Sequence, residues 1–174
     1  MLVTARNLVG AYAGVQGVLA SIGAAGELQN LQNRLRLVTS GSDELSAAQT
    51  RLLEIAQRTR VEFGSTVQIF ARTARSAEAL GATQEDLFQF TERLNKAVTV
   101  SGASSVQAAN AITQLSQALA GGSLRAEEFN SIVENAPFIL TLIADKLGVT
   151  EGQLRKLSSQ GKITSQVIFD AIKN

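Results

Sequence analysis

The sequence predicts an all-α fold: a long N-terminal helix, a central antiparallel helical hairpin or bundle, and a cluster of short C-terminal helices. Three observations predict it. Apolar residues recur at helical spacing in one segment after another. The chain contains a single proline, Pro137, so almost nothing interrupts the helices. Short runs of Gly, Ser and Thr separate the segments and supply turns and helix caps.

The composition excludes several classes of chemistry. The 174 residues are 45% hydrophobic and 18% charged, as in a globular domain, and the formal net charge is +1. This balance gives no general attraction to nucleic acid, and we expect no nucleic-acid site. The chain has no His and no Cys, which removes histidine bases, thiol nucleophiles and Cys/His zinc sites. We therefore expect no metal, no cofactor and no enzymatic activity.

The first segment, residues 7–26, contains no charged residue, and an apolar stripe continues beyond it to Val38. We expect a first helix from about Thr4 to about Leu37. Small and apolar residues follow heptad-like and G-x-x-x-G spacing, which favours close packing against another helix, of this chain or of another copy. The residues of this candidate self-association or membrane face are Leu8, Gly10, Tyr12, Gly14, Val15, Leu19 and Ile22.

An alternative for residues 7–26 is a membrane-active module that inserts during genome delivery, so membrane contact is possible. The segment has about the length of a membrane span. Its five glycines and its polar residues Asn7, Gln16 and Ser21 make it a poor one. We expect residues 1–38 to form an extended amphipathic helical arm and residues 39–174 to form a helical domain.

Two helices are expected next, each with one apolar face. The second should run from Asp43 to about Thr59 and bury Leu45, Leu52 and Ile55. The third should be capped by Ser65, which has capping-box spacing to Gln68, and should end at Gly81. Seven arginines fall between residues 34 and 75 without interleaved aromatic residues, and we interpret them as a solvated face.

The fourth and fifth helices are expected to have similar lengths and a short connection. Thr83 and Ser104 open them, with Asp86 and Gln107 at capping-box positions. The apolar positions that we expect to be buried are Leu87, Phe90, Leu94 and Val98 in the fourth, and Ala108, Ile112, Leu115 and Leu119 in the fifth. Helices of equal length joined by a short loop favour antiparallel packing.

The segment from Gly121 to Leu140 predicts a helix, a corner and a second helix. Gly121 and Gly122 end the preceding helix, and Ser123 can cap the next one. Pro137 suits the start of a new helix, expected over 138–147. Further on, Gly148 and Gly161 should each end a helix. Thr150 should cap the helix after Gly148, with Gln153 at the capping-box position, and a last helix should begin near Thr164.

From about Arg34 to the end, the pattern resembles the N-terminal conserved region of tape measure proteins of long-tailed phages and prophages. The stretch GGSLRAEEFNSIVENAP (121–137) carries the resemblance most specifically. It is supported by residues 101–122, by LGVTEGQLRKL (147–157) and by GKITS (161–165). The motif positions for which we expect a structural role are Gly122, Glu128, Phe129, Asn130, Ile132, Ala136, Pro137, Gly148, Leu154 and Gly161.

The resemblance implies a structural protein of the virion tail that is present in the host cytoplasm during assembly. Tape measure proteins fill the lumen of the growing tail, and their length sets the tail length. The partners implied are further copies of the chain, the tail tube protein, tail assembly chaperones and tail-tip or baseplate proteins. Because such proteins are usually much longer, we expect this chain to be a fragment or a truncated prophage product.

A second alternative is a cell-wall hydrolase fragment that uses Glu127, Glu128 or Glu134. A glycoside hydrolase pair flanks its substrate from opposite sides at about 5 to 10 Å. Here all three acids lie within two turns of one expected helix, and the chain has no Trp for sugar stacking. The sequence therefore favours solvated helix charges over catalytic carboxylates.

Overall fold

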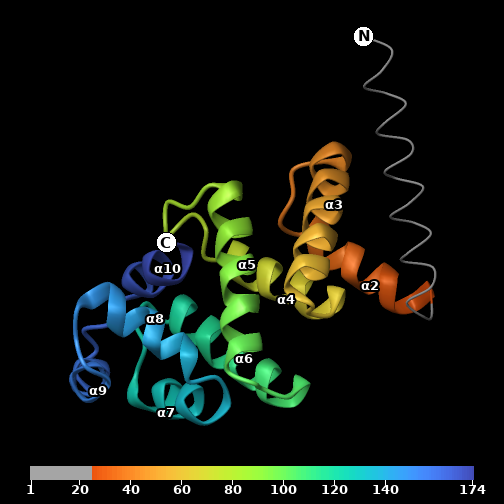
Figure 1. The fold of residues 1–174 in the computed structure, drawn as a ribbon. Coiled ribbons are helices and arrows are strands. Elements are labelled where there is room, and N and C mark those ends of the chain that lie inside the picture. Colours follow the sequence, from red (N-terminus) through yellow and green to blue (C-terminus); the bar gives the residue numbers. More distant parts are fainter. Residues whose placement is uncertain (1–24) are drawn as a thin grey trace.

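The computed structural model describes residues 25–174, which fold into packed helices and contain no β-strand (Figure 1). This confirms the all-α class. The helices are α2 (Ala25–Arg36), α3 (Ser42–Thr59), α4 (Phe63–Ala74), α5 (Gln84–Val100), α6 (Ser105–Ala120), α7 (Ala126–Asn135), α8 (Phe138–Leu147), α9 (Glu151–Ser159) and α10 (Ser165–Lys173).

Helix α5 lies between the two halves of the fold, with α2, α3 and α4 on one side and α7 to α10 on the other (Figure 1). Residues two apart in a helix project about 200° apart. Phe88 accordingly stacks on Phe70 of α4 at 4.9 Å, while Phe90 stacks on Phe169 of α10 at 5.1 Å. The two aromatic pairs join both halves into one continuous core.

A buried asparagine joins α3, α4 and α5. The Nδ2 of Asn95 donates to Thr59 Oγ1 and to Thr66 Oγ1, each at 3.0 Å. The two hydroxyls in turn donate to the carbonyls of Ile55 and Glu62 at 2.8 and 3.1 Å. Since buried polar groups need partners, this network favours one arrangement of the three helices.

The two central helices divide their contacts among several neighbours. Helix α6 contacts α7 most extensively and also touches α4 and α10, whereas α5 packs against α3, α4, α8 and α10. The predicted buried positions of α5 are confirmed, but Phe88, Thr91 and Asn95 are buried as well. Helix α5 is thus surrounded on several sides, and its main contacts are with α3, α4 and α10 rather than with the next helix, α6.

Helix starts were predicted well where the cap is local. Capping boxes form at Thr83 with Asp86, at Ser104 with Gln107 and at Thr150 with Gln153. Two predictions for the third helix were wrong. Helix α4 begins at Phe63 with Glu62 at its capping position, not at Ser65, because buried Phe63 already belongs to its packed face. It ends at Ala74, and turns occupy residues 75–81.

The predicted first helix is described only from Ala25 onward, and the candidate self-association face of residues 8–22 lies outside the described residues. Helix α2 packs on α4 and α3, and Leu35 is 1% exposed. The last turns of α2 therefore belong to the same core as the helices that follow. The division of the chain at residue 38 stays a prediction.

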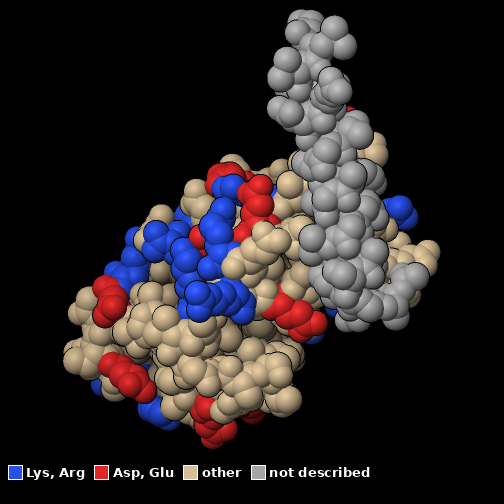
Figure 2. Space-filling view, turned by 45° about the vertical axis from the view of Figure 1, so that its right-hand side comes forward, with Lys and Arg blue, Asp and Glu red and all other residues tan. Residues whose placement is uncertain are grey.

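Charged side chains are concentrated unevenly on the surface. Figure 2 shows a band of Lys and Arg side chains across one face, with acidic side chains near its borders. One ion pair joins α3 to α5, since Arg58 contacts Glu92 at 2.7 Å, and Glu92 also contacts Lys96 of its own helix at 2.9 Å. Exposed pairs of this type contribute little to stability individually.

Candidate functional site

Two stretches that carry the resemblance lie side by side as short antiparallel segments. Leu124 N donates to Ile163 O at 2.8 Å, and Ser165 N donates to Gly122 O at 2.9 Å. Gly122 has φ +83°, a conformation that glycine adopts without strain. The backbone hydrogen bonds thus join the start of the 121–137 motif to the turn before α10.

The prediction that Ser123 caps the next helix was wrong. Ser123 forms an isolated β-bridge with Thr164, and α7 begins at Ala126 with Arg125 at the capping position. The long-range pairing holds Ser123 in extended geometry, two residues too early to serve the helix. Ser158 of α9 adds a buried contact to the same segment, since its Oγ donates to Leu124 O at 3.0 Å.

Helix α7 presents its motif residues to α9. Phe129 and Ile132 are 1% and 0% exposed and belong to the core. The guanidinium of Arg155 lies over the Phe129 ring at 5.1 Å, and its Nη1 donates to Asn130 Oδ1 at 2.8 Å. Leu154, next to it on α9, is fully buried. The 121–137 and 147–157 stretches therefore form one packed unit.

The corner between α7 and α8 has the predicted form. Ala136 is fully buried with φ −156°, and Pro137 stands immediately before α8, which spans 138–147 as expected. Phe138 N donates to Ser101 Oγ at 3.2 Å, which ties the corner to the turn between α5 and α6. Pro137 lacks an N–H and therefore leaves no unpaired donor at this helix start.

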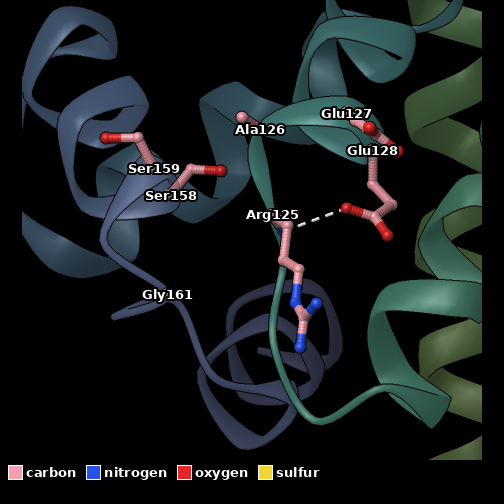
Figure 3. A pocket seen from close by; sticks show the side chains of 7 residues that line it. All are labelled: Arg125, Ala126, Glu127, Glu128, Ser158, Ser159 and Gly161. Atoms are coloured by element: carbon pink, nitrogen blue, oxygen red, sulfur yellow. Dashed lines mark hydrogen bonds between the residues drawn. The ribbon is translucent and has the colours of Figure 1, made fainter.

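A pocket of about 420 Å³ opens where α7 begins beside the end of α9. Figure 3 shows Glu127 and Glu128 on the same helix, away from Ser158 and Ser159 on the other side. Glu128 Oε2 accepts a hydrogen bond from Arg125 N at 3.1 Å, so this carboxylate closes the first turn of α7. Among the residues that line the pocket, no acid lies opposite these two glutamates, so the geometry does not resemble a hydrolase pair.

The glycines of the motif serve as turn positions. Gly148 ends α8 with φ +64°, and Gly161 follows α9 with φ +66°. Four motif positions, Phe129, Ile132, Ala136 and Leu154, are buried in the core. A structural role for the motif positions as a set, and any contact with a partner, stay predictions. Within residues 25–174, no group of three or more acidic side chains is arranged to hold a metal ion. None of the helices in this same range combines the length and the apolar character of a membrane span.

The comparisons with known proteins give one match. A family model described as tape measure protein matches residues 20–174, which is well over half of the chain. No curated protein and no solved structure matches the chain significantly.

Proposed function

Because this chain belongs to the tape measure protein family, a family of phage tail structural proteins, we propose that it sets tail length and scaffolds tail tube assembly through helix–helix contacts. The observation that carries the proposal is the family match over residues 20–174. The partners that we propose are further copies of the chain, the tail tube protein, the tail assembly chaperones and the tail-tip or baseplate proteins.

The fold is compatible with a role that depends on shape. The stretches 121–137, 147–157 and 161–165 contact one another, and each contributes buried residues to the core, among them Phe129, Leu154 and Ile163. The carboxylate of Glu128 already accepts a hydrogen bond from Arg125 N in the first turn of α7. A helical domain of this kind offers surfaces for assembly, and we expect exposed apolar side chains such as Leu37, Val100 and Val106 to contact the partners.

The proposal is tested in the phage or prophage that encodes the chain. A helical insertion placed directly after residue 174 should lengthen the tails by about 1.5 Å per added residue, the rise of an α-helix. Tail length is measured by electron microscopy. The control exchanges the same number of residues at this place without changing the length of the chain, and it should leave the tail length unchanged.

Two results would contradict the proposal. One is a population of tails of normal length after the insertion, with the inserted protein present in the particles. The other is normal tail assembly after deletion of the whole gene. The first result removes the length-setting role alone, whereas the second removes the role in assembly as well.

A further inference from the structure

Three arginines converge on a pocket of about 330 Å³ between α2, α4 and α6. Arg34 comes from the last turn of α2, Arg72 from the last turn of α4, and Arg75 caps the end of α4. The wall contributed by α6 is polar and uncharged, with Thr113 and Ser116 among its residues. The sequence pattern placed these arginines on a solvated face; the fold gathers them around one cavity.

Arg72 is held in place by neutral groups. Its Nη1 donates to Thr113 Oγ1 at 3.0 Å. With the Gln68 amide turned so that its oxygen faces the guanidinium, that oxygen accepts from Nε at 3.2 Å and from Nη2 at 2.8 Å. These contacts fix the orientation of the planar guanidinium without neutralising its charge. Arg72 is therefore a pre-oriented donor at the edge of the pocket.

The positive charge of the pocket is not compensated by acids of the described part of the chain. Among the side chains of residues 25–174 whose placement is described, none of the acids lies within 4.0 Å of Arg34, Arg72 or Arg75, whereas Arg51 and Arg58 do have acidic partners. Burial lowers the pKa of Arg72, and the like charges of Arg34 and Arg75 lower it further. The three guanidiniums thus repel one another, and an anion placed between them would relieve that repulsion.

We propose that this pocket binds a carboxylate from an acidic segment of a partner protein chain. Guanidinium groups match carboxylates in bidentate geometry, and a cluster from three elements can surround one such group. The proposal concerns a binding site and does not depend on the role in setting tail length.

A protein carboxylate fits this pocket better than a nucleic acid does. No aromatic side chain lines the pocket, so a base would find no stacking surface. The formal net charge of the chain is +1, which gives no general attraction to a polyanion. The three arginines line one open pocket, whereas proteins that bind single-stranded nucleic acid use a positively charged groove that follows the backbone.

The test uses a fluorescent peptide of alternating Glu and Ala, and its Gln and Ala analogue, titrated with the purified chain by anisotropy. The decisive variant is R34Q/R75Q. The matched control is R36Q/R93Q, which removes the same charge from two exposed arginines outside the pocket. We expect the Glu peptide to bind about tenfold or more weakly to R34Q/R75Q, because contacts to charged groups are lost. The control variant should bind like the wild type, and the Gln peptide should not bind to any form.

Separate titrations identify the source of the anion. Inorganic phosphate and a single-stranded oligonucleotide are tested with the same variants. Binding of the oligonucleotide or phosphate through Arg34 and Arg75, without binding of the Glu peptide, would overturn the assignment to a protein carboxylate. Equal weakening in both double variants would show general charge attraction and would equally overturn it, as would an absence of binding in the wild type.

Two further measurements cover the case in which a double variant does not fold. Replacement of Arg34 and Arg75 by lysine keeps the charges but removes the bidentate geometry, and should give intermediate affinity. In the wild-type chain, the side-chain NMR signal of Arg72 Nε should shift on addition of the Glu peptide. If that signal does not move while the peptide binds, the pocket is not the binding site.

Discussion

Arg155 of α9 lies over the ring of Phe129 in α7, with its guanidinium 5.1 Å from the ring centre. The ring is buried, and the guanidinium packs over one of its faces. The same guanidinium donates to Asn130, the next residue of α7, at 2.8 Å. One exposed side chain thus fastens two stretches of the family motif together.

Replacing Arg155 with Gln should lower the free energy of unfolding by about 1 kcal/mol, because a cation–π contact at an exposed position and one hydrogen bond are lost. The measurement is urea unfolding followed by circular dichroism. Lys156→Gln is the matched control, since Lys156 is the next residue of α9 and is exposed. Equal losses in the two variants would show that the position over Phe129 has no particular importance.

Ser158 and Ser159 provide a second matched pair. Ser158 is 1% exposed and donates to the carbonyl of Leu124, whereas Ser159 is exposed and donates to Lys156 O within its own helix. Ser158→Ala should reduce the free energy of unfolding by about 1 to 3 kcal/mol, because a buried carbonyl loses its partner. Ser159→Ala should have a smaller effect.

Hydrogen exchange locates the effect of the Ser158 variant. In Ser158→Ala, the amides of Leu124 and Ser165 should exchange faster, because they form the antiparallel hydrogen bonds beside the lost contact. Unchanged exchange at both amides, together with a global loss of stability, would show that Ser158 does not support this segment specifically.

Replacing Gly122 and Gly152 with alanine should change the stability of the fold in opposite directions. Gly122 has φ +83°, so Gly122→Ala should destabilise the fold by about 1 to 2 kcal/mol. Gly152 is the second residue of α9, where an added Cβ meets nothing within 4 Å, so Gly152→Ala should stabilise the fold by up to about 1 kcal/mol. Thermal melting of both variants checks the signs. A stabilising Gly122→Ala would mean that the segment at 122–124 can adopt another backbone conformation.

Local sequence patterns predicted the helices well because capping depends on neighbours in the chain. Thr83, Ser104 and Thr150 each find their partner three residues later, and all three form capping boxes. Ser123 has the same chemistry but was predicted wrongly. Its neighbourhood is fixed by pairing with Thr164, and nothing within the helical window of the sequence indicates that contact.

The candidate sites depend on contacts that join distant parts of the chain. Arg34 and Arg72 were visible as part of a basic segment, but the sequence did not show that α2, α4 and α6 bring them to one pocket. Asn95 was not identified at all, because asparagine in a helix is ordinarily exposed. Its buried network depends on where Thr59 of α3 and Thr66 of α4 lie relative to α5, and that relation exists only in the folded chain.

The last prediction concerns acid stability and the link between α10 and α5. Asp86 Oδ2 accepts from Thr83 Oγ1 at 2.7 Å and from Thr83 N at 2.9 Å, and Lys173 Nζ lies 3.1 Å from Oδ1. These contacts, the Thr83 hydrogen bonds first and Lys173 after them, lower the pKa of Asp86 from 3.8 to about 2. The charged form is therefore favoured in the folded chain.

A depressed pKa contributes stability that is present above the pKa of the unfolded chain and is lost as the pH falls through the folded value. Part of the wild-type stability should thus disappear between about pH 4 and pH 2. Asp86→Asn should be less stable than the wild type at neutral pH, and the difference should shrink across this window. Urea unfolding at several pH values measures it, with Asp145→Asn on the exposed surface of α8 as the control. A difference between Asp86→Asn and wild type that stays constant from neutral pH to pH 2 would show that the ionised carboxylate does not hold the start of α5 to the end of α10.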